Sequence, residues 1–204
     1  MKKLFLAGVL VAGLAAAAYA QDAPPVHIRG VVTSLDGNVL TVGAPIGTAT
    51  TKVTLAPNFK VAYVIRATLA SIVPGSYVGT AAIPQTDGSL RAIEVHIFPP
   101  GLKPGPGTRP WDLTPTSTMT NGNVDNIGAT KVDNVAAGLL KITYEGGEKT
   151  VTVPASASIV GYMPADASAI VTGAHVNFFA IKAADGSLTA ASVNVGKDGL
   201  VPPM

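Results

Sequence analysis

Three histidines are the residues of this chain best suited to chemistry near neutral pH: His27, His96 and His175. In the alternating segment 90–98, Glu94 and His96 share one face, and apolar residues occupy the other. His27 also alternates with apolar neighbours. We therefore expect His27 and His96 to point away from the core of one β module, toward the same side.

Histidines on a shared face can hold a metal. With a carboxylate from Glu94 or Asp112, His27 and His96 have the nitrogen and oxygen donors of a transition-metal site, and Met119 adds a thioether suited to copper. The alternative is that both are surface histidines of a β-barrel, one of them hydrogen-bonded to the segment that follows. His175 is expected to be structural or exposed.

The second candidate feature is the Pro/Gly-rich segment 99–119, which we call the joint. It contains Trp111, the only tryptophan of the chain. Trp111, with Arg109 and Phe98, can form a groove that stacks on a ligand; alternatively, Trp111 anchors the joint to a barrel. Proline and glycine at this density predict that no regular element runs through the joint.

Catalytic patterns do not emerge. The chain has no cysteine, so it offers neither a thiolate nucleophile nor a cysteine metal site. No serine lies in a Gly-x-Ser-x-Gly turn, and the glycines of the joint are interrupted by prolines and lead into no helix. We therefore expect no enzymatic activity and no cofactor, apart from the transition metal considered above.

The amino terminus predicts export. Two lysines, an uncharged apolar run and Ala18-Tyr19-Ala20 form a signal peptide over residues 1–20. Without Lys2 and Lys3, the 12 acidic residues are balanced by an equal number of basic ones. The sequence therefore predicts a periplasmic or secreted bacterial protein, without membrane insertion after cleavage and without nucleic-acid binding.

An internal repeat organises the rest of the chain. Shifted by 98 residues, Asp87-Gly88-Ser89-Leu90 falls on Asp185-Gly186-Ser187-Leu188, and no gap is needed from residue 53 to residue 97. The matching positions are turn residues and alternating apolar residues, which fix strand register. The repeat therefore predicts a duplicated β module and says nothing about a site.

The expected fold is all-β: two tandem, six-stranded, antiparallel β-barrels of OB-like type, with a β-sandwich as the alternative. The first module covers residues 26–98 and the second covers residues 120–196, with the joint between them. Residues 197–204 are expected to form a flexible tail.

The carriers of a family resemblance are Gly30-Val31-Val32, Asp36-Gly37, Leu40-Thr41-Val42, residues 74–78 and residues 87–92. This pattern resembles DUF5666, an exported bacterial β-barrel domain of unknown function. Arg109-Pro110-Trp111-Asp112 in the joint resembles a set of uncharacterised proteobacterial exported proteins. The resemblance implies the barrel fold and the exported location.

Two functional hypotheses follow. The first is a non-catalytic binding or structural protein of the periplasm or cell envelope, which takes an envelope protein or a glycan through the joint and the loops. The second is a periplasmic metal-binding accessory protein that uses His27 and His96 with a nearby carboxylate.

Overall fold

The computed structural model describes residues 24–132 and 135–203 of the 204-residue chain. The expected signal peptide, residues 1–20, lies outside the described residues. The described part is all-β, and no helix in it has the length and hydropathy needed to cross a bilayer. Its strands are β1 (Val26–Asp36), β2 (Val39–Gly43), β3 (Thr50–Arg66), β4 (Tyr77–Pro84), β5 (Leu90–Phe98), β6 (Gly107–Pro110), β7 (Thr118–Val132), β8 (Val135–Tyr144), β9 (Gly147–Val153), β10 (Ser158–Ala165), β11 (His175–Lys182) and β12 (Leu188–Gly196). Three single-turn 3-10 helices accompany them: η1 (Leu69–Ser71), η2 (Ala167–Ala169) and η3 (Lys197–Gly199).

The hairpin turns form where the sequence predicts them. Gly88 and Gly186 adopt positive φ angles of 83° and 86°, a conformation that glycine reaches without strain. In both turns the aspartate carboxylate accepts a hydrogen bond of 2.9 Å from the serine amide two residues later, at Asp87 and at Asp185. These two turns place β4 beside β5 and β11 beside β12.

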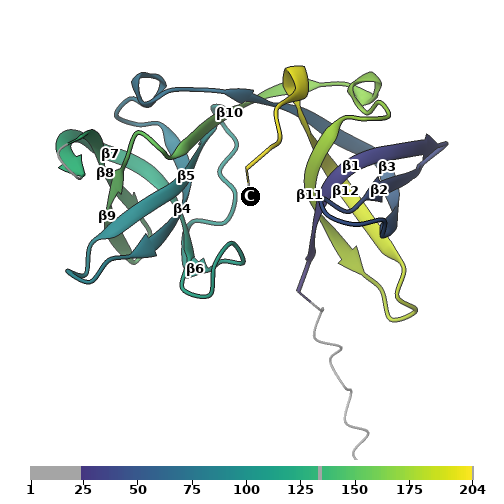
Figure 1. Cartoon of the computed structure of the whole chain (residues 1–204), viewed down its shortest axis with the longest axis horizontal. Coiled ribbons are helices and arrows are strands. Elements are labelled where there is room, and N and C mark those ends of the chain that lie inside the picture. Colours follow the sequence, from purple (N-terminus) through teal and green to yellow (C-terminus); the bar gives the residue numbers. More distant parts are fainter. Residues whose placement is uncertain (1–23, 133–134, 204) are drawn as a thin grey trace, which may run out of the picture.

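A closed five-stranded barrel is built from both ends of the chain, and we call it the terminal barrel (Figure 1). Strands β11, β1, β2 and β3 pair antiparallel in that order, β11 also pairs with β12, and β12 closes the barrel by pairing parallel to β3. Alternation directs one face of each of the five strands inward, and this face carries mainly apolar side chains. The core includes Val32, Leu40, Val42, Val53, Leu55, Phe178, Ala180, Val193 and Val195.

The other five long strands form a second group, which we call the central ring. Strands β5, β4, β7, β8 and β9 pair antiparallel in that order, and β9 pairs parallel to β5 through Leu90–Val151 and Arg91–Thr152. The buried side chains of this group form a separate cluster that includes Val78, Val95, Val124, Leu140, Ile142 and Val151. Each group of five strands therefore surrounds its own core.

Two strands run from one group to the other and form what we call the crossing ribbon. Residues 61–66 of β3 pair antiparallel with residues 160–165 of β10. β10 also pairs parallel to β5, and β3 pairs parallel to β12. The ribbon therefore connects both groups by continuous hydrogen-bonded strands, and it spans the gap between them in Figure 1.

The pairing corrects the expected tandem arrangement. β1–β3, from the expected module 26–98, close a barrel with β11 and β12, which belong to the expected module 120–196. The closed barrel has five strands instead of six, and one of its pairs is parallel. The reason lies in β3: after an irregularity at residues 56–59, where Asn58 has a positive φ, the strand continues through residues 61–66 and pairs with β10 instead of folding back onto its own barrel.

Two further expectations about local structure are also corrected. Residues 107–110 of the joint form strand β6, which pairs with β7. Residues 197–203 pack instead of forming a flexible tail: Leu200 is only 7% exposed and lies in a buried cluster with Val64 and Val160. The tail is also held at Pro203, whose carbonyl accepts a hydrogen bond from Asn177 Nδ2 at 3.0 Å.

Candidate functional site

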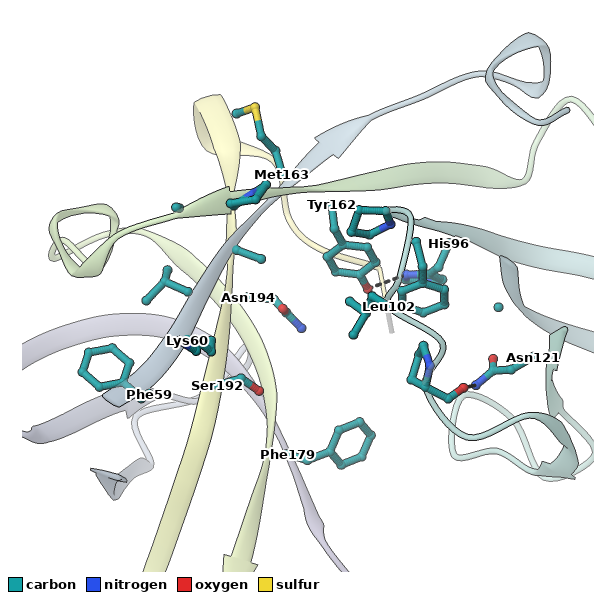
Figure 2. Close-up of a pocket in the computed structure, with 18 of the residues that line it drawn as sticks. Phe59, Lys60, His96, Leu102, Asn121, Tyr162, Met163, Phe179, Ser192 and Asn194 are labelled. Carbon is teal, nitrogen blue, oxygen red and sulfur yellow. Dashed lines mark hydrogen bonds between the residues drawn. The ribbon is translucent and has the colours of Figure 1, made fainter. Parts of the chain in front are cut away.

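A partly open cavity of about 780 Å³ lies between the terminal barrel and the central ring. Its walls come from β3, β4, β5, β7, β10, β11, β12, η2 and the joint. Figure 2 shows the crossing ribbon over the cavity, with Tyr162 and His96 on one side and Phe179 opposite. The exchange of strands therefore creates a cavity lined by residues far apart in the chain, from Asn58 to Asn194.

Aromatic side chains are concentrated in this cavity. Residues 24–203 contain nine Phe, Tyr and Trp residues, and five of them line the cavity. These five are Phe59, Phe98, Trp111, Tyr162 and Phe179. The rings of Phe98 and Tyr162 stack in parallel, with their planes 4° apart and their centroids 5.2 Å apart. Such a lining favours flat, apolar ligands over ions.

A buried polar cluster supports the aromatic wall from the central ring. Glu94 and His96 are 2% and 1% exposed, and His96 Nε2 lies 3.3 Å from Glu94 Oε1. His96 Nδ1 is hydrogen-bonded to the Tyr162 hydroxyl at 2.8 Å. Burial, with a smaller contribution from the Glu94 carboxylate, raises the pKa of Tyr162 well above its ordinary value. Tyr162 therefore enters the cavity as a neutral phenol.

The joint is fastened to the terminal barrel by a second polar cluster. Arg29 donates hydrogen bonds of 2.9 and 2.8 Å to the two carboxylate oxygens of Asp112. His27 Nδ1 lies 3.5 Å from Asp112 Oδ2, and the His27 ring stacks on Phe179 at 4.3 Å. The ring of Trp111 lies 5.8 Å from that of His27. The joint thus closes one side of the cavity.

The charges of this second cluster determine its protonation. Burial and then the positive charge of Arg29 lower the pKa of His27 from 6.5 to about 4, against the opposing effect of Asp112. The hydrogen bonds from Arg29 hold the pKa of Asp112 below its ordinary value. At neutral pH the cluster is therefore an arginine–aspartate ion pair beside a neutral histidine.

The four residues considered as metal ligands lie in two separate pairs. His27 contacts Asp112, and His96 contacts Glu94. Among the residues that the structure describes, no group of three or more His, Cys, Asp and Glu side chains is arranged to hold a metal ion. Met119 is buried in the cavity wall, and His175 pairs with Val31 at the start of β11.

All three residues considered as a ligand groove line the cavity: Trp111, Arg109 and Phe98. The guanidinium of Arg109 lies over the Trp111 ring at 5.6 Å and donates a hydrogen bond to the Gly105 carbonyl at 3.0 Å. Arg109 therefore holds the joint in shape as well as lining the cavity.

Sequence reasoning missed several lining residues, among them Tyr162, Phe179 and Asn121. One signal was present: aromatic residues are scarce in this chain, so each deserved consideration as a lining residue. A second signal was the internal repeat, which continues past residue 97. It places Gly101-Leu102 of the joint on Gly199-Leu200, and Leu102 is one of the residues that line the cavity. No local pattern marks Asn121.

No model of a known protein family, no curated protein and no solved structure matches this chain. The function is therefore argued from the geometry of the cavity.

Proposed function

We propose that this chain is a non-catalytic binding protein of the bacterial periplasm or cell envelope, and that its ligand occupies the cavity between the two strand groups. The observation that carries the proposal is the cavity itself, about 780 Å³ in volume and lined mainly by aromatic and aliphatic side chains. Sites for small molecules have this size and this balance of many apolar groups with a few polar ones.

We also propose that both strand groups are OB-type barrels of the DUF5666 kind that arose by duplication. In this proposal each barrel is completed by strands from the other repeat. Strand pairing supports this. Ser192 pairs with Lys60 in β12–β3, and Glu94 pairs with Ser158 in β5–β10. A shift of 98 residues converts one pair into the other. In the crossing ribbon Tyr162 pairs with Val64, its own repeat equivalent, as expected at the axis of a pseudo-two-fold exchange.

This architecture suits a binding function. In a tandem arrangement a flexible joint would let two barrels move apart, whereas here much of the cavity wall belongs to hydrogen-bonded strands that the two groups share. A site held on strands is more rigid than one held on loops. A preformed cavity also loses less conformational freedom when its ligand binds.

The test is a titration of the mature protein with the neutral dye N-phenyl-1-naphthylamine. Saturable binding with a stoichiometry of one is expected. Ser192→Phe adds a ring to a cavity-lining position and should abolish binding, whereas Ser192→Ala keeps the space and should leave binding unchanged. Absence of binding, or equal binding by the two variants, would refute the proposal.

Metal binding through His27 and His96 is the second candidate. It is favoured by the buried ring nitrogens of His27 and by His96 Nε2, which lack hydrogen-bond partners among the described residues. Addition of Zn²⁺, Cu²⁺ or Ni²⁺ should then raise the melting temperature of the protein, and the rise should be lost in a His27/His96 double alanine variant. No change in melting temperature with any of the three ions would eliminate this candidate.

A further inference from the structure

We infer that the cavity takes a small aromatic molecule carrying an O–H or N–H group, and that this group donates its hydrogen bond to the phenol oxygen of Tyr162. The inference rests on the proposed binding function and adds the chemistry of the ligand. It follows from the direction of the hydrogen bonds on the wall formed by the central ring and the crossing ribbon.

The hydroxyl proton of Tyr162 is engaged by His96, a neighbouring residue of the cavity lining. The Glu94 carboxylate, 3.3 Å from His96 Nε2, favours a proton on that nitrogen. With its proton on Nε2, the imidazole has an acceptor at Nδ1. The Tyr162 hydroxyl, 2.8 Å from Nδ1, therefore donates to it. The lone pairs of the phenol oxygen are left to accept a hydrogen bond from a ligand.

The amide of Asn121, in the same wall, has both of its donor hydrogens engaged within the protein. Its Nδ2 donates to the carbonyls of Pro104 at 2.9 Å and Gly105 at 3.1 Å. Because carbonyl oxygens can only accept, these two bonds fix the orientation of the amide. Oδ1 is thereby left without a hydrogen-bond partner among the described residues, in a side chain that is 2% exposed. A ligand donor that reaches the phenol oxygen of Tyr162 therefore meets an acceptor, and Asn121 offers no competing donor.

A similar amide in the terminal barrel is satisfied by the protein. Asn177 also donates through Nδ2 to a proline carbonyl, that of Pro203. Its Oδ1, however, accepts a hydrogen bond of 3.0 Å from Asn194. In the repeat Asn194 corresponds to His96, which turns instead to Tyr162. The contrast shows that the central ring uses His96 to bind Tyr162, whereas the terminal barrel uses the equivalent Asn194 to satisfy a buried amide.

The rings around Tyr162 determine the rest of the ligand. Phe98 and Tyr162 form a parallel aromatic wall, and Trp111 and Phe179 line the cavity as a second aromatic pair, with ring centroids 6.1 Å apart. Figure 2 places Phe179 across the open space from Tyr162 and His96. A flat ring bound between these walls gains stacking and apolar contact, while its donor reaches the phenol oxygen.

The test compares two probes with the same ring system, 1-naphthol and its methyl ether 1-methoxynaphthalene, by displacement of N-phenyl-1-naphthylamine from the mature protein. Only the naphthol can donate a hydrogen bond. We expect it to bind about tenfold more tightly, the effect of one good hydrogen bond. Tyr162→Phe keeps the ring and should remove the preference. The control Tyr63→Phe, on the same crossing ribbon but outside the cavity, should retain it.

The outcomes separate this inference from the proposed function. Equal affinity for the two probes in the unmodified protein overturns the inference and leaves the binding function standing; this readout needs no variant to fold. Retention of the preference in Tyr162→Phe also overturns it. If neither the dye nor either probe binds, the proposed function itself fails.

Discussion

Leu200→Ala tests the packing of the carboxyl-terminal tail beneath the crossing ribbon. Leu200 is 7% exposed and lies with Val64 and Val160 in a buried cluster. Removing a buried leucine side chain costs about 2–5 kcal/mol of unfolding free energy. Leu200 also lines a surface pocket of about 280 Å³, so we expect the low end of that range, about 2–3 kcal/mol. For a chain of this size the melting temperature should fall by roughly 4–12 °C.

The repeat supplies the matched control. Leu102 occupies the equivalent position in the joint and is 49% exposed, so Leu102→Ala should cost less than about 1 kcal/mol. Thermal unfolding followed by circular dichroism measures both variants. If the two substitutions lower the melting temperature equally, or if Leu200→Ala has no effect, the tail does not pack as described.

Three further predictions concern the exchange, the joint and the cavity wall. Cleavage at a protease site inserted in the exposed loop 114–116 should leave the two fragments associated in gel filtration until denaturant is added, because their strands are exchanged; separation without denaturant would indicate tandem barrels. The free energy of unfolding should fall as the pH drops from about 6.5 toward 4, because the pKa of His27 is about 4 in the folded protein and higher in the unfolded chain, so protonation favours unfolding. Urea unfolding at several pH values measures this dependence. His27→Gln should remove it, and the control His175→Gln should preserve it. Gly79→Ala should destabilise the protein by about 1–3 kcal/mol, because the added Cβ would lie 2.6 Å from a side-chain oxygen, whereas Gly161→Ala meets nothing closer than 3.7 Å and should be tolerated; equal melting temperatures would contradict this.

Local sequence patterns were sufficient for the turns and the strand faces. Asp87-Gly88 and Asp185-Gly186 form the expected turns because an aspartate side chain and a glycine favour that backbone. Glu94 and His96 share a face because strands alternate with a period of two. Both follow from residues close together in the chain.

The exchange of halves could not be predicted in this way. Because the two repeats carry similar strands, β12 can offer β3 the same register that β5 would offer within its own repeat. Whether β3 pairs with β12 or with β5 depends on the direction of the chain after Arg66, and the repeated residues do not specify that direction. The surroundings of His96 depend on that choice, since its partner Tyr162 lies on β10. The sequence therefore indicated that the His96 side chain points away from the core of its own strand group. It did not indicate that the side chain is buried against Tyr162 of β10.

The most direct test of the binding function is a crystal structure of the mature protein with 1-naphthol. The ring should lie in the cavity between the Phe98–Tyr162 wall and Phe179, with its hydroxyl within hydrogen-bonding distance of Tyr162 Oη. An empty cavity in crystals that hold the naphthol elsewhere on the protein would contradict the account.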